Sequence, residues 1–515
     1  MSFSLRIRTL ASETAVYGIS TIVGRIINFL LVPLYVAFFA PGEYGVVVTM
    51  YTTITIINHL FQHGMESSYL KFASGKEGRA RISEVFSTAT WSLFVVSIGL
   101  SVLVLFLRSL VSGIIGIDAE WAYLFYYAIG FQTLDALALL PFSELRLQNK
   151  ASRFALLKMV NIGLNVGLNV VLIIGLGWGI EAVFLSNLIA AGATFLMVLP
   201  TYFQLFRFRI QPGLWRELVW FGLPFVPSGL SYALVDRVNV IFVGRMDATQ
   251  IRVLYEKTFD LSALIANSAT TNAEYGQHMA GIFGAVWKLG VFMMLIAQMF
   301  RFAWQPFFLQ HADDPDARPL FARIFSLFTA FSLLVVLGIT FLIDDFVALP
   351  IAGGRPLIPE MYWPALYLVP IALLAYLFQG WYYHFTAGAY IERKTRYFVY
   401  CTFAGGALTL IANALLVPTY GMIAAAWATT AAYATMAIML YVFVQRFFPV
   451  PYDWRGVALM VGWAGGLYGV WRALPIVQHW WAELVLLGIY LVGILTLRIV
   501  TVQSFRQFMP PARRT

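Results

Sequence analysis

The residues with the clearest chemical potential are charged side chains inside long apolar stretches. Arg25 lies about midway along the apolar run 12–38, with Asn28 one helical turn further on. A charge at the centre of a bilayer costs at least about 2.5 kcal/mol, so it usually faces a cavity or a partner. The planar guanidinium of Arg25 suits a bidentate contact with a phosphate or pyrophosphate. The alternative is a structural ion pair with a carboxylate on a neighbouring helix.

Further cations occur in the second half of the chain. Lys288 and Arg301 are spaced so that, on a helix, they share nearly the same azimuth about 20 Å apart along the axis. This spacing predicts a cationic track on one helix face, although snorkelling to opposite membrane surfaces would also explain it. Asp236 and Arg237 are adjacent. Adjacent helical residues point about 100° apart, so these two are not expected to serve one partner in the same way.

Three polar residues occur within the apolar run 43–70. His59, His63 and Glu66 are spaced by four and three residues, so a continuous helix places them on one face. Two imidazoles and a carboxylate could bind a metal, but the segment lacks the glutamate of the zinc-protease motif, and we predict no metal site. A proton relay, a contact to sugar hydroxyls and a polar cavity lining all stay open. We interpret the three residues, together with Asp236, as candidates for ion coupling.

A polar stripe is predicted in the run 154–175. Asn161, Asn165 and Asn169 follow one another at four-residue intervals, which puts them on one helix face. Small residues beside such a stripe allow another helix to approach closely, and amide side chains bond across such contacts. Interhelical packing is therefore favoured over substrate contact.

The elements that carry these residues belong to a very apolar chain. Of 515 residues, 60% are hydrophobic and 11% are charged, whereas soluble domains carry roughly 25% charged residues. This composition excludes a soluble enzyme and a disordered chain, and the single cysteine excludes a disulfide scaffold. The apolar runs are too long for the ~10-residue alternating strands of a β-barrel, so we expect membrane-spanning helices.

The apolar runs predict an all-α polytopic membrane protein with about fourteen transmembrane helices of about 20 residues or more. We place them at residues 12–38, 43–70, 84–107, 120–143, 154–175, 181–205, 217–243, 281–309, 320–343, 361–389, 397–417, 421–445, 454–474 and 480–500. Most Lys and Arg residues fall at the two termini and in every second connection, which predicts that both termini are cytoplasmic. The net charge of +9 is then a topology signal, and no nucleic-acid partner is expected.

An internal repeat divides the chain. QNKASRF, from Gln148, aligns with ERKTRYF, from Glu392, and the stretches that follow each copy align as well. We therefore expect two six-helix lobes related by pseudo-twofold symmetry, with substrate handled at their interface. The predicted lobes are 1–210 and 211–448, the second containing a polar periplasmic insert at 247–279, and residues 449–515 form an extra transmembrane helix pair and a cytoplasmic tail.

Motifs for soluble chemistry are missing from the sequence. It contains no GxxxxGK[ST] phosphate loop, no nucleophile elbow and no zinc-ligand spacing. We therefore expect neither an enzyme nor a cofactor. No connection is long enough for a nucleotide-binding domain, so transport would run on a gradient or downhill.

Several stretches resemble one known family. They are ETAVYGISTIVGRIINFLLVPLYVAFFAPGEYGVV, HGMESSYLKFAS, FGLPFVPSGLSYALVDRVNVIFVG and GIFGAVWKLGVFMMLIAQMFRFAWQPFFL. Together they are similar to the polysaccharide-transporter branch, the Wzx-type flippases, of the multidrug/oligosaccharidyl-lipid/polysaccharide exporter superfamily. The resemblance implies two lobes around a V-shaped cavity that opens alternately to either side. The extra terminal pair is similar to that of lipid II flippases.

The resemblance implies a flippase for an undecaprenyl-pyrophosphate-linked oligosaccharide, a unit of O-antigen, capsule or exopolysaccharide, in the bacterial inner membrane. Arg25 matches a cavity arginine of the family, and Asp236 and Arg237 match a common Asp-Arg pair. Lys288 falls where the family often has a Tyr-Lys pair, with Trp287 in place of the tyrosine. The polar insert departs from the family, whose connection there is short.

The resulting hypothesis is alternating access with ion coupling. Arg25, Asn28, Lys288, Arg301 and Arg237 are the predicted substrate contacts. Predicted partners are the lipid-linked oligosaccharide, membrane lipid, H+ or Na+ and a polysaccharide polymerase. The alternatives are a cation-coupled multidrug or metabolite antiporter, which predicts a cavity rich in carboxylates, and a membrane-embedded glycosyltransferase, which predicts catalytic carboxylates in the insert.

Overall fold

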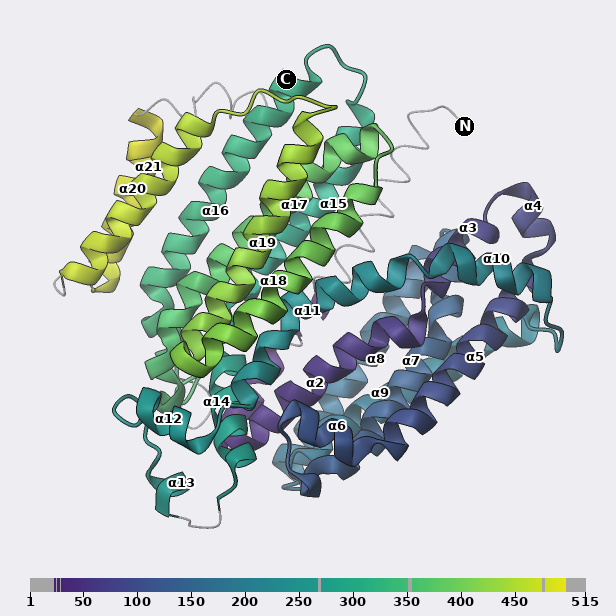
Figure 1. The fold of residues 1–515 in the computed structure, drawn as a ribbon, viewed down its shortest axis with the longest axis horizontal. Helices are drawn as coiled ribbons and strands as arrows, with labels where there is room; N and C mark the ends of the chain where they lie inside the picture. The colour runs from purple at the N-terminus through teal and green to yellow at the C-terminus, as the bar shows by residue number, and fades with distance from the viewer. Residues whose placement is uncertain are drawn as a thin grey trace, which may run out of the picture. The chain divides into compact units, whose positions relative to one another are not determined.

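The computed structural model describes residues 23–24, 26–27, 29–266, 270–350, 354–474 and 478–496. Within these ranges the regular elements are helices (Figure 1), apart from one isolated bridge between Pro350 and Pro356. The helices are α2 (Pro41–Gln62), α3 (Met65–Phe72), α4 (Gly75–Ala80), α5 (Ile82–Phe106), α6 (Arg108–Ile115), η1 (Ala119–Tyr123), α7 (Leu124–Leu147), α8 (Ala151–Asn169), η2 (Val170–Gly175), α9 (Glu181–Leu205), α10 (Pro212–Gly222), α11 (Phe225–Gly244), α12 (Ala248–Tyr255), α13 (Ser262–Ala266), α14 (Asn272–Trp287), η3 (Lys288–Gly290), α15 (Val291–Gln310), α16 (Ala317–Ala348), η4 (Glu360–Leu368), α17 (Val369–Ile391), α18 (Arg396–Tyr420), α19 (Met422–Gln445), α20 (Trp454–Ala473) and α21 (Trp480–Thr496).

The chain is an all-α polytopic membrane protein. Eleven helical stretches in the described ranges are long and apolar enough to cross a membrane, and they correspond one by one to the second to twelfth predicted spans. The predicted last pair corresponds to α20 and α21, and the described part of the predicted first span is helical over Phe29–Phe38. The predicted fold class is therefore confirmed.

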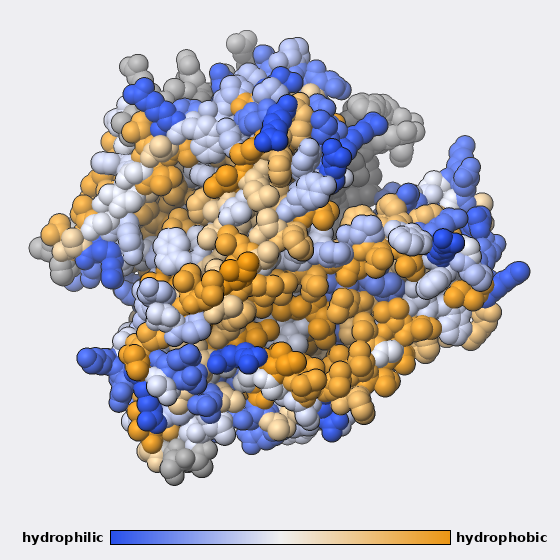
Figure 2. Space-filling view, viewed as in Figure 1, coloured by the Kyte–Doolittle hydropathy of each residue, from blue (hydrophilic) through white to orange (hydrophobic). Residues whose placement is uncertain are grey.

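The helices form two compact units. Unit 1 comprises the described residues of 1–288 and 402–432, and unit 2 comprises those of 289–401 and 433–515. The lobe boundaries expected from the repeat stay a prediction. On the face shown in Figure 2, apolar side chains form a broad band over the helices of unit 1, and hydrophilic side chains gather at its ends near α4 and near α12. This distribution is what a bilayer requires, because lipid tails contact the band and water contacts the ends.

Helix α7 is central in unit 1, where it packs against α2, α3, α5, α8 and α9. The asparagine stripe serves packing, as predicted. Asn161 donates to Thr194 of α9 at 2.9 Å, and Asn169 accepts from the Tyr35 hydroxyl at 3.0 Å.

A buried carboxylate joins three helices at the α4 end of unit 1. Glu144 of α7 is 2% exposed. Its carboxylate accepts hydrogen bonds from the Tyr69 hydroxyl at 2.7 Å, the Arg79 guanidinium at 2.6 Å and the Gln148 amide at 2.5 Å. A buried charge is tolerated only when it is paired and hydrogen-bonded in this way, so Glu144 ties α3, α4 and the end of α7 together.

The second predicted span is broken where α2 meets α3. His63 and Gly64 have positive φ angles of 31° and 75°, and α2 therefore ends at Gln62. The prediction that His59, His63 and Glu66 share one helix face is wrong, because it assumed a continuous helix.

Gly64 at this break supports a stability prediction. A Cβ on Gly64 would lie 2.0 Å from the carbonyl oxygen of Gly222 in α10. Gly75 has a similar φ of 73°, but its Cβ would meet open space. We expect Gly64→Ala to lower the thermal unfolding temperature in detergent clearly, whereas Gly75→Ala costs only the ~1 kcal/mol of a left-handed backbone. Equal shifts for the two variants would contradict the tight α3–α10 contact.

The eighth span begins earlier than predicted. Thr271 Oγ1 accepts from the backbone of Glu274 at 3.1 Å, and the Glu274 carboxylate accepts from the backbone of Thr271 at 2.7 Å. This capping box starts the helix at Asn272. The segment predicted as a polar insert, 247–279, thus contains the start of α14. We call residues 245–271, between α11 and α14, the insert.

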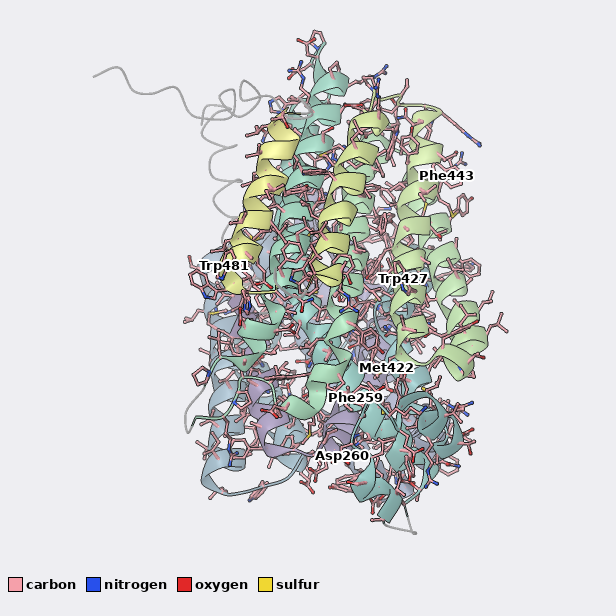
Figure 3. All side chains as sticks on the ribbon, turned by 90° about the vertical axis from the view of Figure 1, so that its left-hand side faces the viewer. Phe259, Asp260, Met422, Trp427, Phe443 and Trp481 are labelled. Carbon is pink, nitrogen blue, oxygen red and sulfur yellow. The ribbon has the colours of Figure 1, made fainter. Side chains whose placement is uncertain are left out.

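The insert is tied to two other turns of unit 1. The Tyr255 hydroxyl accepts from the backbone N–H of Met422 at 2.6 Å, at the α18–α19 turn, and Thr271 donates to Asp118 at 2.8 Å. Figure 3 labels Met422, Phe259 and Asp260 at this end. Hydrogen bonds from Ser262 lower the pKa of Asp260. We call this end of unit 1 the insert side.

Unit 2 is built around α16, which packs against α15, α17, α20 and α21. Aromatic rings fill the contact between α15 and α17, where Trp304 stacks on His384 at 4.6 Å between ring centroids. The terminal pair is held by hydrogen bonds: Tyr490 donates to the backbone of Ala330 at 3.0 Å, and Trp471 donates to Glu483 at 3.0 Å.

Candidate functional site

The cation Lys288 stands at the end of the long helix α14, within the eighth span. It is half-buried and begins the 3₁₀ turn η3. Its ammonium lies 5.6 Å from the ring centroid of Tyr44 in α2, which is within the range of a cation–π interaction. No described carboxylate lies within ion-pair distance of Lys288. Lys288 therefore faces α2 within unit 1.

Arg237 of α11 is the second cation at this place. It is close enough to Lys288 for the two charges to repel each other. Its Nε lies 2.9 Å from the Asp236 carboxylate, and the two side chains are 39% and 16% exposed. The adjacent residues thus pair with each other, because their flexible side chains bridge the angle that separates them on the helix. We call Lys288, Arg237, Asp236 and Tyr44 the Lys288 cluster; its net charge is positive.

Arg301 belongs to α15 in unit 2. Its side chain is exposed, and its guanidinium carbon lies 5.1 Å from the ring centroid of Tyr383 in α17. The 3₁₀ turn η3 interrupts the helix between Lys288 and Arg301, and the two residues belong to different units. The cationic track along one face stays a prediction.

The ion-coupling candidates of α2 and α3 point to three different neighbours. His59 is covered by α11, where a Cβ on Gly229 would lie 2.6 Å from its Nδ1. The Nε2 atom of His63 is 2.9 Å from the Ser92 hydroxyl of α5. Glu66 is ion-paired with Arg146 of α7.

Two predicted substrate contacts, Arg25 and Asn28, lie outside the described residues. Within the part of the chain that the structure describes, no group of three or more His, Cys, Asp or Glu residues is arranged to hold a metal ion.

Sequence reasoning missed Tyr44 of α2, which lies against Lys288, and Gln277, which joins α14 to α2 through Thr49. One signal was present. Gly276, Ala280 and Gly284 recur at four-residue intervals, and small residues with this spacing indicate a close helix contact.

The comparisons with known proteins agree on the fold. Residues 36–274 match a family model described as "Polysaccharide biosynthesis protein". Among curated proteins, none matches the sequence.

Several solved structures share the fold of this chain. It is similar to "Lipid II flippase MurJ, inward closed conformation", with a TM-score of 0.70 and 14% identity over 95% of this chain and 99% of that one. An inward-facing multidrug resistance MATE transporter of the MOP superfamily matches with a TM-score of 0.61 and 13% identity, over 82% and 94% of the two chains. The Vibrio cholerae MATE transporter VcmN matches with 0.55 and 13%, over 85% and 97%.

The match to the flippase structure extends into the terminal helix pair. It covers 95% of this chain, and the residues left unmatched are fewer than those of α20 and α21 together. The fold shared with the flippase structure therefore includes at least part of this pair. At these identities the likeness establishes the fold alone.

Proposed function

We propose that the protein moves an undecaprenyl-pyrophosphate-linked oligosaccharide, a unit of O-antigen, capsule or exopolysaccharide, from the cytoplasmic to the periplasmic leaflet of the bacterial inner membrane. The Lys288 cluster carries the proposal, because it holds a net positive charge among apolar helices. An anionic head group is the natural ligand of such a cluster. The polysaccharide biosynthesis family match supports the same substrate class.

The energetic problem of such a substrate is its polar head. Each polar group that enters lipid without a partner costs several kcal/mol. In the proposed function, Lys288 and Arg237 contact the pyrophosphate, together with Arg25 and Asn28, while the prenyl chain stays in lipid. Arg301 of unit 2 stays a predicted substrate contact. No bond is made or broken, so the activity is transport without catalysis.

Alternating access with ion coupling completes the proposal. Each charge that crosses the membrane contributes ~2.3 kcal/mol per 100 mV. Asp236 is the coupling candidate that lies beside the cations, so H+ or Na+ bound there would change the charge of the Lys288 cluster by one unit. Glu66, His59 and His63 are the further candidates, and Glu66 would have to exchange its partner Arg146 for the ion.

The proposed setting is a multi-pass inner-membrane protein with both termini in the cytoplasm. The insert then lies in the periplasm, on the side where a polysaccharide polymerase would receive the translocated substrate. In this setting, membrane lipid would contact the apolar band that one face of unit 1 presents in Figure 2.

The test is a flipping assay with the purified full chain in vesicles. A fluorescent undecaprenyl-pyrophosphate oligosaccharide is added, and a membrane-impermeant quencher reports its leaflet. We expect faster exchange than in protein-free vesicles, and no acceleration for an undecaprenol glycan that lacks the pyrophosphate. Extrusion of a cationic dye without movement of the lipid-linked glycan would instead identify a multidrug antiporter and overturn the proposal.

A further inference from the structure

Helices α2 and α14 touch along a line of glycines. A Cβ on Gly45 would lie 1.8 Å from the carbonyl oxygen of Gln277, and a Cβ on Gly281 would lie 1.9 Å from the carbonyl oxygen of Pro41. At Gly284 the nearest atom is Val48 Cγ1, at 2.8 Å. The backbones therefore meet without intervening side chains. We call this contact the seam.

Gln277 closes the seam on the insert side. It is 2% exposed, and its amide oxygen accepts from the Thr49 hydroxyl at 2.9 Å. Its amide nitrogen donates to the carbonyl oxygen of Gly116 at 2.7 Å, in the connection between α6 and η1. One side chain thus joins α14, α2 and this connection. A buried amide that loses such partners costs about 1–3 kcal/mol, so the bonds favour the closed seam.

Lys288 lies on the same side of α14 as the residues of the seam. Gln277, Gly281, Gly284 and Lys288 follow one another at intervals of four, three and four residues, so they occupy one face of α14. The closed seam thereby holds the Lys288 ammonium over Tyr44, which is buried in α2. If α14 separated from α2, the ammonium would lose this ring.

We propose that the seam is a closure on the insert side that positions Lys288, so that the cation is presented to an anionic head group only while this side is shut. Gln277, Gly281 and Tyr44 are then positioning residues that act through Lys288. This inference rests on the proposed function for the identity of the ligand. The closure itself does not depend on it.

The first arm of the test measures closure without substrate. Cys401 is replaced by serine, and Val48→Cys reports the seam through its reaction with a membrane-impermeant thiol reagent; Val48 is 6% exposed. We expect slow labelling in this background, and labelling at least about fivefold faster with Gln277→Leu or Gly281→Ala, since both weaken the contact. Gly213→Ala is the matched control, because its Cβ would meet open space.

The labelling rates test whether the seam is a closure. Equal labelling rates in Gly281→Ala and Gly213→Ala would overturn this part of the proposal. Gln277→Leu keeps this arm decisive if Gly281→Ala does not yield folded protein.

The second arm measures positioning, with undecaprenyl pyrophosphate as the probe in detergent. We expect Gly281→Ala and Tyr44→Leu to raise its Kd about fivefold, and Tyr44→Phe, which keeps the ring, to leave it unchanged. Faster labelling with an unchanged Kd would overturn the positioning role. If the unsubstituted protein does not bind the probe, the proposed function fails, and the labelling arm still decides the closure.

Discussion

Replacing Lys288 by methionine is expected to slow the flipping of the lipid-linked oligosaccharide at least about tenfold. Methionine keeps an unbranched apolar stem but removes the ammonium that would contact the pyrophosphate. A hydrogen bond to a charged group contributes about 1.5–3 kcal/mol, and about 1.4 kcal/mol corresponds to a factor of ten. The measurement is the initial rate in the vesicle flipping assay, normalised to the reconstituted protein.

Two further variants serve as controls for Lys288→Met. Lys288→Arg keeps the charge and should retain part of the rate, although a guanidinium differs from an ammonium in geometry. Lys257→Met removes an exposed lysine of the insert and should leave the rate unchanged. If Lys288→Met flips the substrate at the wild-type rate, the Lys288 cluster does not bind the substrate.

Replacing Glu144 by leucine is expected to cause the largest loss of stability, about 2–4 kcal/mol. The substitution removes the acceptor for Tyr69, Arg79 and Gln148. The buried Tyr69 hydroxyl then loses the carboxylate that accepts its hydrogen bond, whereas Arg79 is 35% exposed and can turn to water. The measurement is the thermal unfolding temperature of the purified protein in detergent.

The matched control is Glu84→Leu in α5. Glu84 pairs with Arg81, but its side chain is 43% exposed, and exposed ion pairs contribute only about 0–1 kcal/mol. Glu144→Gln should fall between the two, because the amide still accepts one or two hydrogen bonds. If Glu144→Leu unfolds at the temperature of Glu84→Leu, the Glu144 network does not stabilise the α4 end of unit 1.

The two predictions probe different parts of unit 1. Glu144 acts where α3, α4 and α7 end, and Lys288 acts at the inner end of the seam. We expect Glu144→Leu to change stability more than the transport rate per folded molecule. Lys288→Met should change transport with little loss of folded protein.

Sequence alone determined the helical class, the positions of the spans and the packing role of the asparagine stripe. These properties depend on apolar run length and on residue period, which are local. Asn161 and Asn169 could be assigned because any neighbouring helix satisfies an amide stripe. The helix that supplies the partner did not need to be known.

Only the tertiary structure decided which side chains meet. His59, His63 and Glu66 separated because two left-handed residues break the helix, a feature that hydrophobic periodicity does not reveal. Tyr44 reached Lys288, and Tyr69 reached Glu144, across long stretches of chain. Such pairs depend on how closely two helix backbones approach, and at the seam that approach is set by Gly45 and Gly281 on different helices. A property of two segments packed together cannot be read from either segment alone.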